Sequence, residues 1–241
     1  AGIETASGLL ENEAAELNIG FVSRMTRGRP WLRLKAAASL DGKTALNNGL
    51  SQWITGPDAR RDGHAWRARA CAILTGIGTV RDDDPQLNVR DLATSRQPLR
   101  VVVDSQLETP LGARILRGGN VLVAGAVADP VRIAALQTAG AEVFIQANAS
   151  GKVDLAALLT ELGRRGVNEV HAEAGFKLNG SLVREDLVDE FLIYLAPCLV
   201  GHAAQGLCNL PELDSLAGKR SLDIRDLRRV GGDIRILARP L

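Results

Sequence analysis

The chain has 241 residues, of which 46% are hydrophobic and 24% are charged, and its formal net charge is +1. These values exclude a disordered chain and a disulfide-dependent miniprotein, and they predict one large domain or one domain with an appendage. The balanced charge provides no global field for nucleic acid or an anionic membrane, so we expect neither as a partner. Aromatic residues make up only 3%, which leaves little for stacking nucleic-acid bases.

The three cysteines, Cys71, Cys198 and Cys208, form no C-x-x-C pair. An odd number of cysteines argues against a disulfide framework and favours a reducing compartment. No apolar run approaches the ~20 residues of a membrane span, and the N-terminus lacks a signal-peptide pattern. The sequence therefore predicts a cytoplasmic protein. Its acidic start, AGIETASGLLENEAAELN, and its single methionine, Met25, leave open a fragment of a longer chain.

The first predicted element is an amphipathic helix over residues 9–22. Its apolar positions recur at steps of four, three and four residues: Leu10, Ala14, Leu17 and Phe21. Residues 24–30, RMTRGRP, read as a basic turn or linker. We therefore divide the chain into a helical segment with a linker at 1–29 and a domain at 30–241.

From residue 31 the pattern alternates between strands and helices. We expect strands at 31–37, 71–76, 99–105, 120–125, 141–146, 168–175, 190–201 and 232–240. We expect helices at 55–70, 129–140, 153–166 and 176–186. Such alternation predicts parallel pairing and a three-layer α/β domain. Little helix separates the last two strands, which predicts an antiparallel edge.

Glycines follow two of the predicted strands, and ligands bind beyond the carboxyl ends of strands in such sheets. Gly76, Gly78 and Gly175 let backbone N–H groups approach a phosphate closely. Gly175 also leads into a helix whose N-terminus suits a pyrophosphate. Each glycine alone is better explained as a simple chain turn, but two such loops in one sheet predict a nucleotide cofactor.

Three other patterns fail as motifs. His171-Ala172-Glu173 matches one half of a zinc deaminase site, but the P-C-x-x-C half is absent, so we expect no metal. Residues 175–181 have the glycine spacing of a P-loop without its lysine, and Gly76-Ile-Gly78 lacks the third glycine of the dinucleotide fingerprint. The Asp82–Asp84 run before a proline predicts a turn or cap rather than a metal site.

Four basic residues are candidates for phosphate binding. Arg60, His64 and Arg67 recur at steps of four and three along the predicted 55–70 helix and form one basic stripe. Arg90 adds a second guanidinium, and arginine forks suit a terminal phosphate. The alternative for the stripe is an ordinary solvated face.

Two charged residues in strands are candidates for the reacting centre. Lys35 lies on a strand face that is either edge-exposed or lines a pocket, together with Trp31, Arg33 and Ala37. Glu173 ends an otherwise apolar strand, just before the Gly175 turn.

Seven strings, in order from about residue 30, resemble the reductase domain of the bifunctional riboflavin biosynthesis protein: SLDGKTAL, SQWITG, TGIGTVRDDDPQLNVR, VDS, EAGFKLNGSL, LVDEFLIYLAP and GLC. The resemblance implies a mixed, mostly parallel sheet flanked by helices, similar in fold to dihydrofolate reductase. It implies reduction of a phosphorylated pyrimidine, 5-amino-6-(5-phosphoribosylamino)uracil, with NADPH as hydride donor. The family protein also carries an N-terminal zinc deaminase domain, which this chain lacks. We take a homodimer as the default assembly, because cyclic pairs are the commonest.

The resemblance also implies which residues form the site. Substrate contacts are implied at Ser51, Arg67, Leu87, Arg90, Glu173 and Lys35. NADPH contacts are implied at Ala37, Trp53, Thr79, Asp83, Ser105 and the loop formed by Gly175, Phe176, Lys177, Leu178, Asn179, Gly180 and Ser181. A dihydrofolate-type reductase and a non-catalytic nucleotide-binding module stay open as alternatives.

Side-chain chemistry suggests roles for Lys35, Glu173 and Ser105, and for Arg114 near Ser105 in the sequence. Lys35 can donate to a uracil carbonyl and Glu173 can accept from a ring N–H, which makes them the catalytic candidates. The alternative for that pair is a simple structural ion pair. Ser105, with Arg114 nearby in the sequence, suits the 2′-phosphate of NADPH.

Overall fold

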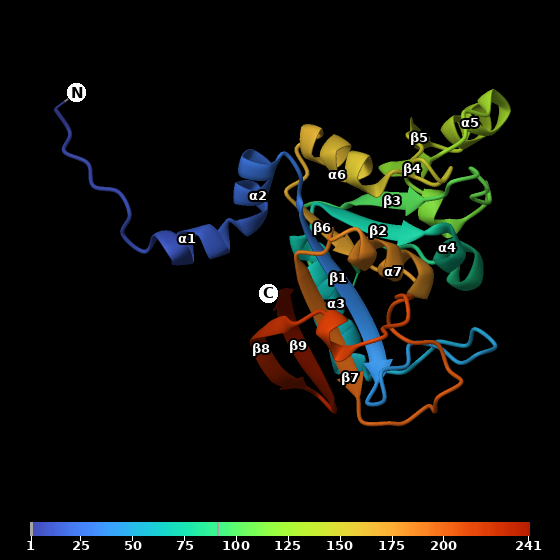
Figure 1. The fold of residues 1–241 in the computed structure, drawn as a ribbon. Helices are drawn as coiled ribbons and strands as arrows, with labels where there is room; N and C mark the ends of the chain where they lie inside the picture. Colours follow the sequence, from blue (N-terminus) through green and yellow to red (C-terminus); the bar gives the residue numbers. More distant parts are fainter. Residues whose placement is uncertain (1, 91) are drawn as a thin grey trace.

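The computed structural model describes residues 2–90 and 92–241, and these form a nine-stranded sheet with helices on both of its faces (Figure 1). The strands are β1 (Trp31–Ser39), β2 (Ala72–Gly76), β3 (Leu99–Val103), β4 (Val121–Gly125), β5 (Ala141–Ile145), β6 (Glu169–Ala172), β7 (Glu190–Ala196), β8 (Leu222–Val230) and β9 (Asp233–Pro240). The α-helices are α1 (Glu11–Leu17), α2 (Ile19–Arg27), α3 (Pro57–Arg69), α4 (Ile77–Asp83), α5 (Pro130–Thr138), α6 (Leu155–Arg164) and α7 (Phe176–Arg184). Two short 3-10 turns are η1 (Arg114–Leu116) and η2 (Leu216–Gly218).

The strand order is β5-β4-β3-β2-β6-β1-β7-β9-β8. The strands from β5 to β7 in this order pair in parallel, and β9 and β8 complete the sheet as an antiparallel edge. Both the parallel pairing and the antiparallel edge are confirmed. The first strand of the chain, β1, lies well inside the sheet between β6 and β7, so its Lys35 face is not at an edge and that alternative is wrong.

Two elements were missed by the sequence patterns. The strand β8 has the sequence LDIRDLRRV, and most of its side chains are half-buried or exposed, because it is an edge strand. Its charges hide the alternation that marks a half-buried strand. The short helix α4 follows β2 directly, in the segment expected to turn; Asp84 ends it in a left-handed conformation, with φ 38°.

The helix ends follow their local sequence signals. Asp129 accepts hydrogen bonds from the N–H groups of Val131 and Arg132, and Pro130 occupies the first position of α5. The side chain of Asp154 caps α6 in the same way. No helix among the described residues is long and apolar enough to cross a bilayer.

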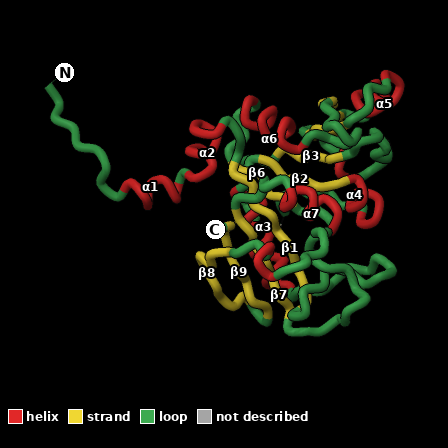
Figure 2. The backbone as a smooth tube through the Cα atoms, in the orientation of Figure 1, coloured by secondary structure: helices red, strands yellow, loops and turns green. Residues whose placement is uncertain are grey.

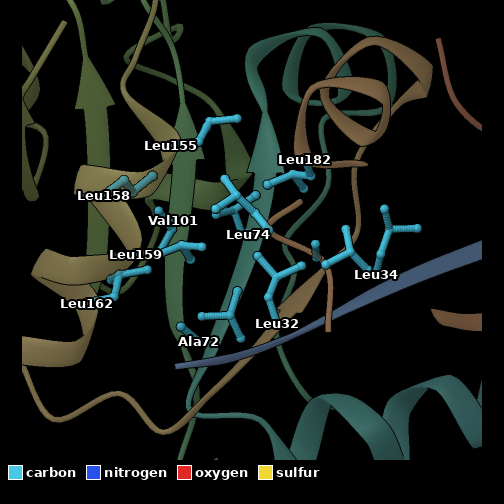
Figure 3. Packing of buried hydrophobic residues seen from close by; sticks show 14 of the residues in the cluster. Leu32, Leu34, Ala72, Leu74, Val101, Leu155, Leu158, Leu159, Leu162 and Leu182 are labelled. Carbon is cyan, nitrogen blue, oxygen red and sulfur yellow. The ribbon is translucent and has the colours of Figure 1, made fainter. Parts of the chain in front are cut away.

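The main core lies between the sheet and the pair α6 and α7. Figure 3 shows leucines from β1, β2 and both helices meeting there, among them Leu32, Leu74, Leu158 and Leu182, each at most 1% exposed. Alternate residues of β2, β3 and β4 point to the opposite face, where α4 and α5 pack over a second cluster. The helix α3 covers the strand β7. Burial on both faces explains why these strands read as continuous apolar runs.

The N-terminal segment departs from the prediction. The expected helix over 9–22 is broken at Asn18 into α1 and α2, and the expected linker at 24–30 supplies the last turn of α2. Asn18 donates its side-chain N–H to the carbonyl of Ala14, which closes α1 locally. No residue of α1 is buried, and Figure 2 shows α1 extending away from the sheet. The apolar stripe is therefore exposed, with Leu17 at 81%.

Candidate active site

The charged candidates meet at the carboxyl ends of the central strands. Lys35 lies on β1, and Glu173 directly follows β6, the strand paired between β1 and β2. The Glu173 N–H donates to the carbonyl of Leu74 on β2, at 2.8 Å, which continues the sheet by one residue. Lys35 lies midway along β1, but its neighbour Leu34 pairs with Ala172, the last residue of β6, so the parallel pairing places Lys35 level with Glu173.

Glu173 is the centre of a charged cluster. Arg67, on α3, grips it with a fork: Nε donates to Oε1, and Nη2 donates to Oε2 at 2.9 Å. The Nζ of Lys35 lies 3.9 Å from Oε2 of the same carboxylate. The side chains of Lys35, Arg67 and Glu173 are 24%, 15% and 13% exposed. The ion pair considered as an alternative for Lys35 and Glu173 is therefore present, although at the limit of contact distance.

The cluster fixes the charges of its members. Burial would raise the pKa of the Glu173 carboxyl, but Arg67 and Lys35 outweigh it and hold the pKa well below its usual range. Burial lowers the pKa of the Lys35 ammonium, Glu173 opposes this change, and Arg67 adds to it. At neutral pH Glu173 is therefore a carboxylate acceptor that is paired with the Arg67 guanidinium, with the Lys35 nitrogen 3.9 Å away.

The basic stripe of α3 faces the protein rather than solvent, so the solvated-face alternative is wrong. The Arg60 guanidinium lies over the ring of Trp53, 4.6 Å from its centroid. His64 is buried. Arg67 bonds Glu173 and also directs Nη1 to the carbonyl of Asn88, at 3.4 Å. The arginines at the two ends of the stripe thus hold two parts of the candidate site.

Segments on either side of α3 and α4 carry further candidates, and one of them, at Asn88, contacts the cluster through Arg67. Arg90 is exposed, and its Nη1 lies 3.4 Å from the side-chain oxygen of Asn88, the residue whose carbonyl Arg67 contacts. Leu87 is buried with a positive φ of 46°. Ser51 is half-buried. Gln52, its neighbour, donates to Asp83 at 3.3 Å.

Two helices begin at glycines on this edge of the sheet. Gly76 precedes α4 and Gly175 precedes α7, and neither helix has a side-chain capping hydrogen bond. Their first-turn N–H groups therefore point outward without a capping side chain. A Cβ at Gly76 would lie 3.2 Å from Leu178, and one at Gly175 would lie 3.7 Å from Oγ1 of Thr79. The Gly76 turn is thus tightly packed, whereas the Gly175 turn leaves ordinary contact distance, and both have the backbone donors that a phosphate requires.

The predicted 175–181 loop is divided by the structure. Phe176, Lys177 and Leu178 form the first turn of α7. Asn179 is 2% exposed and donates to the carbonyl of Leu207, and Gly180 packs directly against the backbone of Asn209. Ser181 donates back to the carbonyl of Lys177. The N-terminal part of this loop therefore faces the strand ends, while Asn179 and Gly180 serve the 207–209 segment.

The remaining cofactor candidates lie along the same edge. Ala37 is half-buried on β1. Ser105 follows β3, and its Oγ accepts from the N–H of Val153 at 3.2 Å. The backbone N–H of Arg114 donates to Asp84, and its exposed side chain forms no ion pair with the other described residues. Within the same residues, no three His, Cys, Asp or Glu side chains are grouped to hold a metal ion.

Sequence reasoning missed a second polar chain beneath Lys35. The Nζ of Lys35 lies 5.9 Å from the ring centroid of Tyr194. The Tyr194 hydroxyl donates to Asp62 at 2.5 Å, and Arg235 from β9 pairs with the same carboxylate at 2.9 Å. The available signal was the chain's one tyrosine, two residues from Leu192, which lies beside Lys35 in the sheet.

The mixed, mostly parallel sheet, its helical layers and the charged strand ends define an α/β protein with a dihydrofolate-reductase-like fold. The sequence profile described as "RibD C-terminal domain" matches residues 30–236, and the chain belongs to this family. It is 40% identical over 251 residues to the riboflavin biosynthesis protein RibD of Escherichia coli K12, covering 97% of this chain. The alignment spans 66% of that relative's length.

Solved structures give the same result. RibD of Acinetobacter baumannii matches all of this chain and 66% of its own, with a TM-score of 0.89 and 36% identity. A protein of Thermotoga maritima matches 100% of this chain and 65% of its own, with a TM-score of 0.82 and 25% identity. The latter is named a diaminohydroxyphosphoribosylaminopyrimidine deaminase/5-amino-6-(5-phosphoribosylamino)uracil reductase. The predicted fold class and the predicted family are confirmed.

Proposed function

We propose that this chain reduces 5-amino-6-(5-phosphoribosylamino)uracil to the corresponding ribitylamino compound, with NADPH as the donor, in riboflavin biosynthesis. The observation that carries the proposal is the cluster of Lys35, Arg67 and Glu173 at the strand ends, next to the glycine turn that opens α7. A pyrimidine edge needs a donor and an acceptor side by side, and a phosphate needs cations nearby. The family membership supports the same substrate class.

The substrate would lie against the charged cluster. Lys35 donates to a ring carbonyl, and Glu173, held by Arg67, accepts from a ring N–H. Arg90, together with the Nη1 side of the Arg67 guanidinium, binds the 5′-phosphate at the Asn88 segment that both arginines contact. Ser51 and Leu87 complete the substrate pocket. The carboxylate needs Arg67 for its orientation, because Lys35 alone is too distant to fix it.

The cofactor would lie across the glycine turns. The first-turn N–H groups of α7 bind its pyrophosphate, with Thr79 opposite Gly175. The remaining proposed contacts are Ala37, Trp53, Asp83, Ser105 and the 175–181 loop. The exposed guanidinium of Arg114, which forms no ion pair among the described residues, favours NADPH over NADH, since a 2′-phosphate adds two negative charges there. When bound, NADPH supplies a hydride to C1′ of the ribosyl group.

Purified protein mixed with NADPH and each candidate substrate tests the proposal. NADPH absorbance should fall with the phosphoribosylaminouracil, and not with dihydrofolate. Turnover of dihydrofolate, without turnover of the phosphoribosylaminouracil, would contradict the proposed substrate class and favour a dihydrofolate-type reductase. Tight NADPH binding by calorimetry without turnover of either compound would instead identify a non-catalytic nucleotide-binding module.

The organisation of the whole protein is part of the proposal. We propose that the reductase domain starts at residue 30, because the family profile starts there and β1 begins at Trp31. The relatives' greater length supports a deaminase domain as a partner of this chain. Free cysteines support a cytoplasmic location. The exposed edge of β8, with Ile224 and Leu227, supports a homodimer; a monomer mass by light scattering would contradict that assembly.

A further inference from the structure

His171 is a fully buried histidine that the proposed function does not use. It lies on β6, with Arg33 beside it on β1 and Ile73 beside it on β2. Its side chain is 0% exposed, and neither ring nitrogen has a hydrogen-bond partner among the described residues. Buried polar groups without partners cost free energy and are rare. The placement of this imidazole therefore calls for a physical reason.

The carboxylate of Glu173 provides a reason for the position of the His171 ring. The Nε2 of His171 lies 3.5 Å from Oε1 of Glu173, two residues further along the chain. This separation is slightly longer than a normal hydrogen bond. Contacts of this kind shorten when a bound ligand settles the carboxylate. The imidazole thus lies beneath the carboxylate that we propose as the pyrimidine acceptor.

Burial, modified by the surrounding charges, sets the protonation of His171. The facing groups are Glu173 after β6, Arg33 and Lys35 on β1, and Arg67 on α3. Burial lowers the pKa of His171 to about 3; Glu173 opposes this shift, and the three cations add to it. The ring is therefore neutral at physiological pH and has one N–H. A lone pair on Nε2 would face the negative oxygen, so the favoured tautomer has its proton on Nε2.

We propose that His171 is a positioning residue, whose neutral Nε2–H holds the Glu173 carboxylate in the orientation that binds the substrate. Arg67 and Lys35 already supply the positive charge, and a third cation would be repelled there. With an apolar side chain at position 171, Arg67 would be the single donor to Oε1 of Glu173. A neutral donor orients the carboxylate without changing the net charge of the cluster. The substrate part of this inference rests on the proposed function, whereas the tautomer part does not.

The tautomer can be measured without any enzymatic activity. The chain has three histidines, so selective ¹⁵N labelling gives a simple spectrum, and the spectrum of His171→Gln assigns the resonance. We expect the neutral Nε2–H pattern for His171, unchanged between about pH 8 and pH 5. A neutral ring with its proton on Nδ1, or an imidazolium within that range, would overturn the proposal.

Two substitutions separate positioning from packing. Glutamine carries its amide nitrogen near the position of Nε2, whereas asparagine carries it near Nδ1 and does not reach Glu173. We expect His171→Asn to raise the KM for the phosphoribosylaminouracil about tenfold, the effect of one ordinary hydrogen bond. His171→Gln should stay within about threefold of wild type, and kcat should change less than KM in both. Exposed His202→Asn is the matched control, with no expected change.

The outcomes distinguish this inference from the proposed function. Equal KM values for His171→Gln and His171→Asn contradict positioning, even in an active enzyme. Wild-type protein that does not turn over the substrate overturns the proposed function, while the tautomer measurement still decides the state of His171. If the His171 variants fail to fold, the spectra of His64→Gln and His202→Asn assign the His171 resonance by elimination, and the wild-type tautomer still decides.

Discussion

Removing Arg67 should destabilise the fold as well as the substrate site. Arg67→Ala deletes the fork on Glu173 and leaves this carboxylate with Lys35 at 3.9 Å as its nearest cation. Both members of the fork are at most 15% exposed, so water replaces the lost contacts poorly. Breaking a buried pair by removing one partner costs about 3–5 kcal/mol, and the remaining exposure favours the lower end, about 3 kcal/mol.

A double-mutant cycle isolates the fork. Urea denaturation at neutral pH should give a coupling of about 1.5 kcal/mol or more between Arg67→Ala and Glu173→Gln. Arg61→Ala is the matched control on the same helix, because its pair with Asp58 is exposed and should contribute less than about 0.5 kcal/mol. Additive single effects, or a loss below about 1 kcal/mol for Arg67→Ala, would refute the reasoning.

The same pair predicts how stability depends on pH. The pKa of Glu173 is lowered from its ordinary value of 4.5. Its contribution is therefore complete above that ordinary value and is lost as the pH falls through the lower folded-state pKa. Wild-type protein should lose stability on acidification more steeply than Glu173→Gln. Identical acid profiles for the two proteins would contradict a charged, paired Glu173.

Four further outcomes are expected. Arg114→Ala should reduce the preference for NADPH over NADH at least tenfold in kcat/KM, and equal use of both cofactors by wild type would contradict the role of Arg114. Arg90→Ala should lower kcat/KM for the phosphorylated substrate by about 10- to 150-fold with an unchanged Tm, and Arg90→Lys should recover part of it. Protein treated with a chelator should keep its full reductase activity. Stoichiometric zinc in the purified protein, with activity lost on its removal, would contradict this expectation. Plotted against pH, kcat/KM should start to fall below the ordinary lysine pKa of 10.5, because Lys35 loses its proton as the pH rises through a lowered pKa. In Lys35→Arg this fall should move to higher pH.

Local signals explain how much of the fold could be predicted. The runs that become β3 and β4 are apolar because both faces of the sheet are covered, and Asp129 and Gly140 mark the ends of the helix between β4 and β5. These signals lie within a few residues of what they determine. The pattern at 9–22 is also a local signal, and its helical period does not show whether the helix is buried. The described structure provides no surface that buries its apolar face.

The sequence indicated which residues belong to the candidate site, but not how they contact one another. Strand ends and glycine turns indicated Glu173 and Gly175, because each directly follows an apolar strand. The fork between Arg67 and Glu173 joins residues 106 positions apart, so it depends on how α3 lies across the strand ends. His171 gave no signal beyond a failed metal motif, since its role depends on the burial and charges around it.

The central position of β1 determines when the protein can fold during synthesis. This strand is made first, yet its neighbours β6 and β7 are made late; Arg33 pairs with Glu169 across 136 residues and with Glu190 across 157. Closing such long loops is slow and must precede the stabilising contacts. A nascent chain that stops before Ala196 leaves β1 without complete pairing, and an unpaired apolar strand promotes aggregation. Truncation from the C-terminal side therefore threatens solubility even while Lys35, Arg67 and Glu173 are all still present.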